Sequence, residues 1–208
     1  MSGKHASLAF MLSLATMAAL AQSNGELAES GFVSALQGEQ PQTIESFLTE
    51  TKDSKTLSTA ERGILKWISN GALDTESIRK AGEILDTNNL PSMEVESNFE
   101  ADSEVVGQDS LEALGKALQN DALASVQILL TGHTDAKGDN DYNLTLSKAR
   151  AEAVRSRLIL EYGIAPDRII AIGFGEERLT NSSDPESTVN RRVEIVNIGD
   201  VQQLDQRQ

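Results

Sequence analysis

Apolar and polar residues follow two different periods along this chain. Between residues 22 and 90, apolar residues recur at the three- and four-residue steps of amphipathic helices, as in Ile44 and Leu48. Ser58 opens a capping-box pattern before a second such segment, and Asp74 is placed to cap a third. The pattern therefore predicts three short helices, which form either a minimal bundle or a layer against the residues that follow.

Trp67 is the single tryptophan of the chain. Large aromatic side chains are mostly well buried, so we expect Trp67 to anchor the core of this helical region. An exposed contact residue is the alternative reading.

After a turn cluster at residues 88–91, the period changes to the alternation typical of half-buried strands. Strands are predicted at 93–99, 126–130, 168–174 and 191–198, and helices from a capping box at Asp109 and over 144–162. This order predicts an α+β fold, a βαβαββ two-layer sandwich whose mixed sheet carries helices on one face, preceded by the small helical region.

The first residues resemble a secretory signal. Lys4 and His5 precede an apolar run of roughly fifteen residues, short of the length that spans a bilayer. A small-x-small pattern ends at Ala21, where we expect cleavage. A retained anchor is the alternative, whereas a lipoprotein anchor is excluded because Gln22 and not cysteine follows the cut.

The predicted organisation is therefore a signal peptide at 1–21, a helical region of unknown role at 22–90, the main domain at 91–200 and a tail at 201–208. No apolar run of membrane length remains in the mature chain.

The formal net charge of −14 disfavours nucleic acid as a partner, because such a surface repels phosphate backbones. The chain has no cysteine, so disulfides, thiolate nucleophiles and cysteine-bound metals are excluded. His133 is the only histidine after the predicted cut, which leaves little to build a catalytic triad or a metal site. We expect no cofactor, no metal and no catalysis.

The candidate site lies where the second predicted strand ends. Asp135 follows that strand, and Arg150 lies fifteen residues later on the long helix. A carboxylate and a guanidinium so placed suit a ligand that carries both an ammonium and a carboxylate. Asn143, seven residues before Arg150, and backbone N–H groups around Thr134 would complete the site. From spacing alone, the favoured reading is that Asp135 and Arg150 form an ion pair with each other or with neighbouring residues.

The same stretch resembles the OmpA-like C-terminal domain of the OmpA/MotB/Pal peptidoglycan-binding family. The family pattern has TD, then G, N, LS, RA and, near the end, NRRV. It is matched in order over roughly residues 92–199 by Thr134-Asp135, Gly138, Asn143, Leu146-Ser147, Arg150-Ala151 and Asn190-Arg191-Arg192-Val193.

The resemblance implies that Asp135 and Arg150 clasp diaminopimelate of the peptidoglycan stem peptide. It also implies that Asn143 and Arg192 lie near the ligand. The segment at 181–190 is shorter than in many family members, which puts the rim of the pocket and the role of Arg192 in question.

The expected function is thus non-covalent peptidoglycan binding, which tethers a periplasmic or outer-membrane-associated protein of a Gram-negative envelope to the cell wall. Residues 22–90 are a candidate surface for an envelope protein partner. The alternatives are a cell-wall hydrolase or amidase, and a stator-like linker anchored in the inner membrane by its retained N-terminal segment.

Overall fold

The computed structural model describes residues 43–51, 56–71, 74–97 and 107–200, which belong to one compact unit. The predicted signal peptide with its cut after Ala21, and the predicted tail, lie outside these ranges. Within them, none of the helices combines the length and apolar composition that crossing a bilayer requires. The domain limits derived from the sequence remain a prediction.

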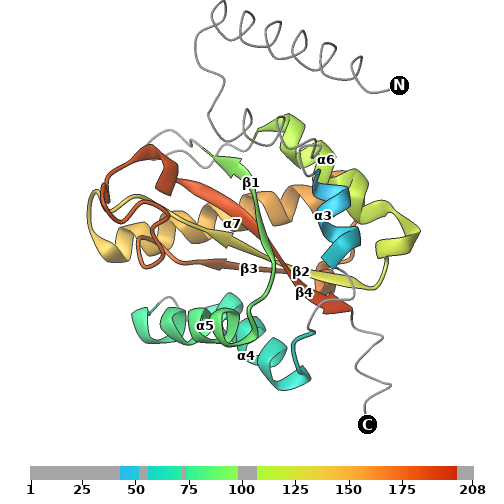
Figure 1. Cartoon of the computed structure of the whole chain (residues 1–208), viewed down its shortest axis with the longest axis horizontal. Coiled ribbons are helices and arrows are strands. Elements are labelled where there is room, and N and C mark those ends of the chain that lie inside the picture. Colours follow the sequence, from blue (N-terminus) through green and yellow to red (C-terminus); the bar gives the residue numbers. More distant parts are fainter. Residues whose placement is uncertain (1–42, 52–55, 72–73, 98–106, 201–208) are drawn as a thin grey trace, which may run out of the picture. The chain divides into compact units, whose positions relative to one another are not determined.

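Helices and strands follow one another in the predicted order (Figure 1). The helices are α3 (Ile44–Thr51), α4 (Thr59–Gly71), α5 (Thr75–Asn88), α6 (Gln108–Gln119) and α7 (Asn140–Tyr162). The strands are β1 (Ser92–Ser97), β2 (Val126–Gly132), β3 (Ile169–Gly173) and β4 (Arg192–Asp200). Short 3-10 turns lie at Asp121–Leu123, Pro166–Arg168 and Thr188–Asn190.

The four strands form one mixed sheet in the order β1-β4-β2-β3. Strands β2 and β3 are parallel and are joined by the long helix α7, whereas β4 runs antiparallel to both β1 and β2. The βαβαββ fold class predicted from the sequence is confirmed. The carboxyl ends of β2 and β3 meet at one edge of the sheet, where a ligand site is expected in such layouts.

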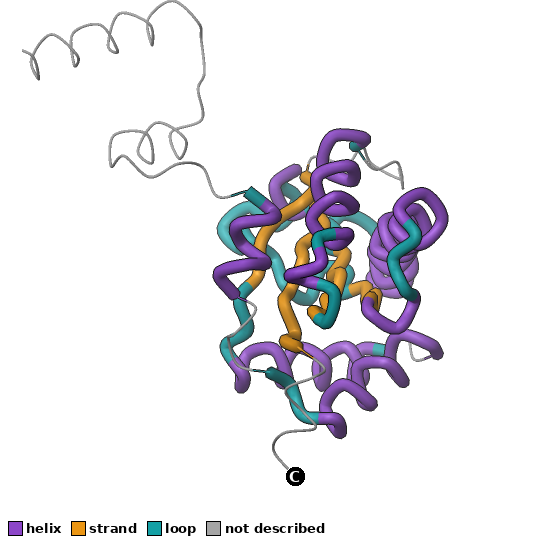
Figure 2. The backbone as a smooth tube through the Cα atoms, turned by 90° about the vertical axis from the view of Figure 1, so that its right-hand side faces the viewer, coloured by secondary structure: helices purple, strands orange, loops and turns teal. Residues whose placement is uncertain are grey.

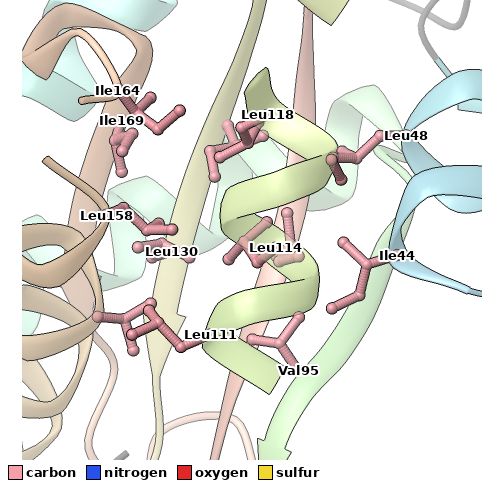
Figure 3. Packing of buried hydrophobic residues seen from close by; sticks show 14 of the residues in the cluster. Ile44, Leu48, Val95, Leu111, Leu114, Leu118, Leu130, Leu158, Ile164 and Ile169 are labelled. Carbon is pink, nitrogen blue, oxygen red and sulfur yellow. The ribbon is translucent and has the colours of Figure 1, made fainter. Parts of the chain in front are cut away.

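One face of the sheet packs against α3, α6 and α7 (Figure 3). Alternate strand residues such as Ile128, Leu130 and Ile195 face this side, because side chains of a strand point to opposite faces in turn. Leu114 of α6 and Leu158 of α7 are buried among them, as the helical spacing predicted. This layer corresponds to the helix layer of the predicted sandwich.

The other face of the sheet is covered by α4 and α5. Leu129, Ile170 and Val196 point to this side and share a core with Leu65 of α4 and Ile78 of α5. Figure 2 shows the strands between the two sets of helices. The N-terminal helices therefore pack against the following domain, as one of the two predicted arrangements has it, but they divide between its faces: α4 and α5 cover this face, and α3 lies with α6 and α7 on the other.

Two cations fasten α4 to the rest of the unit: Arg62 is buried and Lys148 is partly buried. Arg62 donates to the carbonyl of Ile198 at 2.6 Å and to the side-chain oxygen of Gln127 on β2. Lys148 of α7 donates to the carbonyl oxygen of Ser69 at the end of α4 at 2.7 Å. Each of these hydrogen bonds compensates for the hydration that the charged side chain loses on burial. Helix α4 is therefore held by polar contacts as well as by its apolar core.

One predicted helix cap is confirmed, whereas the predictions for a second cap and for Trp67 are wrong. The capping box at Ser58 is confirmed, because its N–H donates to Glu61 at 2.8 Å. Asp109 is not a cap: α6 begins one residue earlier and is capped by Gly107. The prediction for Trp67 was wrong, since its side chain is 64% exposed on the outer side of α4. Leu65 and Ile68 turn toward the sheet, and Trp67 lies between them in sequence on the opposite side.

We predict that the α4 layer carries stability of the whole unit. Leu65→Ala should lower the free energy of unfolding by about 2–5 kcal/mol, because Leu65 is fully buried against the sheet. The matched control on the same helix is Trp67→Ala, which should change it by no more than about 0.5 kcal/mol. Urea denaturation followed by circular dichroism measures both, and equal effects of the two variants would contradict this packing.

Candidate functional site

The close approach of α7 to the ends of β2 and β3 positions the candidate site. A Cβ atom on Gly132 would lie 1.9 Å from the carbonyl oxygen of Ser147, and one on Gly173 would lie 2.3 Å from the backbone nitrogen of Lys148. Only glycine fits at both strand ends. The buried hydroxyl of Ser147 also accepts from the N–H of Gly175 at 2.8 Å, which fixes the helix against the loop after β3.

Arg150 lies one helical turn beyond this contact and is fully buried. Its guanidinium donates to the carbonyl oxygen of His133 at 3.2 Å, directly before the loop that carries Asp135. The helix extends further toward the N-terminus than predicted, from Asn140, with Asp139 as its cap. Arg150 is thus held in the middle of a rigid helix and under the loop after β2.

The loop after β2 is tied down by its own backbone. The N–H of Thr134 donates to Gly175, and the N–H of Ala136 donates to Pro185, each at 2.9 Å. The N–H of Thr134, which was predicted to bind the ligand, therefore already has a backbone partner. Asp135 sits between these two anchors with 8% of its surface exposed.

A cavity of about 380 Å³ opens between this loop, α7 and the loop before β4. It is lined by Thr134, Asp135, Lys137, Gly138, Tyr142, Asn143, Leu146, Arg150, Glu186 and Arg191. Four of the five predicted site residues, namely Thr134, Asp135, Asn143 and Arg150, thus line one cavity.

Asp135 makes its ion pair with Arg191 and not with Arg150. The Nη1 atom of Arg191 lies 2.9 Å from Oδ2 of Asp135, and both side chains are largely buried. Arg191 is not among the site residues predicted from the sequence. The signal for it was present: Arg191 shares the face of the last strand with Val193 and Ile195, which pack against α7 and its neighbours.

Arg192, the fifth predicted site residue, is not brought to this cavity. Its guanidinium donates to Glu194 at 2.6 Å and to the carbonyl of Arg178 at 3.1 Å, on the α5 side of the sheet. Adjacent residues in an extended backbone point to opposite faces, so only one arginine of the pair reaches the cavity. That arginine is Arg191.

The side chain of Asn143 holds the loop after β2 against α7. Its Nδ2 atom donates to the carbonyl oxygens of Asp135 and Lys137, each at 3.3 Å, and to Glu176 at 2.7 Å. These bonds join the loop to the first turn of α7. The buried hydroxyl of Thr134, by contrast, has no hydrogen-bond partner within the described part of the chain.

The OmpA family model matches residues 98–192. The chain contains an OmpA-family domain. Residues of this chain are 43% identical over 72 residues to outer membrane porin F of Pseudomonas aeruginosa and 32% identical over 99 residues to the peptidoglycan-associated lipoprotein of the same organism. These alignments cover 34% and 47% of the chain and 21% and 58% of the two relatives.

Among solved structures, the chain is similar to the peptidoglycan-associated lipoprotein of Burkholderia pseudomallei, with 30% identity and a TM-score of 0.43. The match covers 49% of this chain and 87% of that one. The helices α3, α4 and α5 precede the segment that the family model matches.

His133 of the OmpA-like domain is buried on the α5 side of the sheet, 2% exposed and stacked on Phe174 with ring centroids 5.6 Å apart. One ring nitrogen contacts the hydroxyl of Thr131 at 3.1 Å, and the other has no partner among the described residues. Burial, with Arg192 and Arg178 nearby, holds the pKa of His133 well below its usual range. Across the described ranges, no three His, Cys, Asp or Glu residues gather as a metal site would require.

We predict that His133 makes the unit sensitive to mild acid. In the unfolded chain its imidazole gains a proton near pH 6.5, whereas in the folded protein it stays neutral to well below that value. The unfolded state therefore binds more protons below pH 6.5, and stability should fall with decreasing pH by up to about 1.4 kcal/mol per unit.

Urea denaturation between pH 5 and pH 7.5 measures this slope, above the range where carboxylates titrate. His133→Gln should flatten it. An equal slope in the variant and the original chain would refute the assignment to His133.

Proposed function

We propose that the OmpA-like domain binds peptidoglycan non-covalently by holding the zwitterionic end of diaminopimelate in the cavity beside α7. The observation that carries this proposal is the placement of Asp135 and Arg150 on the lining of one cavity of about 380 Å³. Arg150 takes the carboxylate of the ligand, and Asp135 accepts from its ammonium. The cavity is about the size of a small-ligand site.

The arrangement favours such a ligand because the charged side chains of the cavity are held in place before the ligand binds. Arg150 is fixed by its bond to His133, and the loop of Asp135 is fixed by Asn143 and by its backbone bonds. Fixed groups lose little freedom when the ligand arrives. Charge-assisted hydrogen bonds contribute about 1.5–3 kcal/mol each, which predicts roughly micromolar to millimolar affinity for a free stem peptide.

Such affinity is adequate for a polymer that offers the same site many times, because repeated sites keep a released protein close to the next one. The chain has a net charge of −14 and peptidoglycan is rich in carboxylates, so long-range attraction does not drive the encounter. Recognition therefore depends on the local cavity.

The names of the relatives support a role at the cell wall, since two of the matched proteins are called peptidoglycan-associated lipoproteins. We infer that the protein is a non-enzymatic tether of the periplasm, associated with the outer membrane. The exposed surface of α4 and α5 is available for an envelope protein partner. In this reading His133 supports the loop of Asp135 and performs no catalysis.

The first test is co-sedimentation of the purified chain with peptidoglycan sacculi. Asp135→Asn and Arg150→Met should each weaken binding roughly ten- to a hundredfold, because each removes one charge-assisted bond to the ligand. Matched controls are Asp167→Asn, remote from the cavity, and Arg157→Met, which lies on α7 and pairs with Glu161.

Circular dichroism and thermal unfolding verify that each variant remains folded. Retention of full binding by both site variants would show that the cavity is not the binding site. A clearing zone in a peptidoglycan zymogram would show that the protein hydrolyses peptidoglycan, which contradicts a non-enzymatic tether.

The second test is competition by the isolated head group. Free meso-diaminopimelate in millimolar amounts should release the chain from sacculi, whereas the same compound with both amines acetylated should not, because Asp135 then lacks an ammonium to accept from. The released fraction is read from the supernatant after centrifugation. Equal release by the acetylated compound would contradict the role given to Asp135.

A further inference from the structure

We propose that helix α5, which precedes the segment matched by the family model, positions the ligand cavity through the ion pair of Asp86 with Arg178. The turn at residues 175–178 carries this effect from the helix to the loop of Asp135. Asp86 and Arg178 are positioning residues, because neither of them lines the cavity. The inference rests on the proposed function, and it gives part of the helical region at 22–90 a role in binding.

Two hydrogen bonds join α5 to the turn. The Nη1 and Nη2 atoms of Arg178 lie 3.0 and 2.7 Å from the two carboxylate oxygens of Asp86. A bidentate pair fixes the direction of the guanidinium as well as its distance, which a single contact does not. The position of the turn therefore depends on a helix that is 92 residues away in sequence.

The guanidinium of Arg178 also lies close against α5 and Phe174. A Cβ atom on Gly82 would lie 3.1 Å from its Nη1 atom, so the glycine leaves the room that the guanidinium uses. The guanidinium carbon lies 5.7 Å from the centre of the Phe174 ring, in the range of a cation–π contact. Two of the three residues that place Arg178, namely Gly82 and Asp86, thus come from α5.

The first residues of the same turn hold the loop of Asp135. The carbonyl oxygen of Gly175 accepts from the N–H of Thr134 at 2.9 Å. The carboxylate of Glu176 accepts from the side chain of Asn143 at 2.7 Å, and Asn143 also donates to the carbonyl oxygen of Asp135. The turn therefore contacts the residue before Asp135 directly and reaches Asp135 itself through Asn143.

The turn is short and is hydrogen-bonded at both ends. The N–H of Glu177 donates to the carbonyl oxygen of Phe174 at 3.1 Å, and the carbonyl oxygen of Arg178 accepts from Arg192 at 3.1 Å. Gly175 has a φ of 55°, in the left-handed region that favours glycine. Such a turn has little room to absorb a displacement of Arg178, so the displacement reaches the contacts of the loop of Asp135.

Isothermal titration calorimetry with a stem tripeptide that ends in meso-diaminopimelate tests the effect on binding. The variants are Asp86→Asn, Arg178→Met and the two combined. The matched control is Glu83→Gln, because Glu83 is an acid of the same helix whose ion pairs are with Arg79 and Lys80 rather than with the turn.

Each single variant should weaken binding of the tripeptide about two- to fivefold, the range of a partly exposed ion pair, whereas Glu83→Gln should bind as the original chain does. The effect is modest because Ser147 also holds Gly175. The double variant should bind no more weakly than the weaker of the two single variants, since both substitutions break the same contact.

Hydrogen exchange measures the positioning without any ligand. The N–H of Thr134 reports opening of its bond to Gly175, and the N–H of Leu129 in the central strand β2 reports unfolding of the whole unit. The rate of Thr134 relative to Leu129 should rise about two- to fivefold in Asp86→Asn and stay unchanged in Glu83→Gln. A general loss of stability would raise both rates equally and leave the ratio unchanged.

Unchanged binding by Asp86→Asn and Arg178→Met would overturn this inference and leave the proposed function standing. Equal weakening by Glu83→Gln would overturn the role of the ion pair. Weaker binding at an unchanged exchange ratio would overturn the route through the turn. Absence of tripeptide binding by the original chain would overturn the proposed function and this inference together.

Discussion

The contact of α7 with the ends of β2 and β3 is the constraint on which the site depends. Glycine at positions 132 and 173 lets the helix backbone rest directly on the strands, and Ser147 fastens it there. A side chain at either glycine would place its Cβ inside the helix backbone, so the helix could not rest where it does. Arg150, one turn further along, would then lose its position under the loop of Asp135.

The same contact explains how charged side chains from separate segments gather at one cavity. Arg150 comes from the helix, Arg191 from the start of the last strand and Lys137 from the loop, and the packing of three elements brings them together. Arg191 contacts Oδ2 of Asp135, and both residues line the cavity. Binding by local charges in this way needs no favourable field from the rest of the surface.

The helices α4 and α5 make the sheet a three-layer arrangement. They cover Leu129, Ile170 and Val196, which the βαβαββ segment alone would leave in water. Arg178 extends this layer to the loop after β3 by a bidentate ion pair with Asp86. The N-terminal helices therefore serve the fold of the OmpA-like domain, in addition to any partner that they bind.

The sequence by itself determined the order of the elements, the caps at Ser58 and Asp74, and the buried faces of α6 and α7. These follow from local periodicity and from residue types at fixed spacing, which act within one element or one loop. Only the tertiary structure decided which arginine of the NRRV motif reaches the cavity, and that Trp67 is exposed. Both depend on which face of a strand or helix meets its neighbour, and a shift of one residue reverses that face without changing the local pattern.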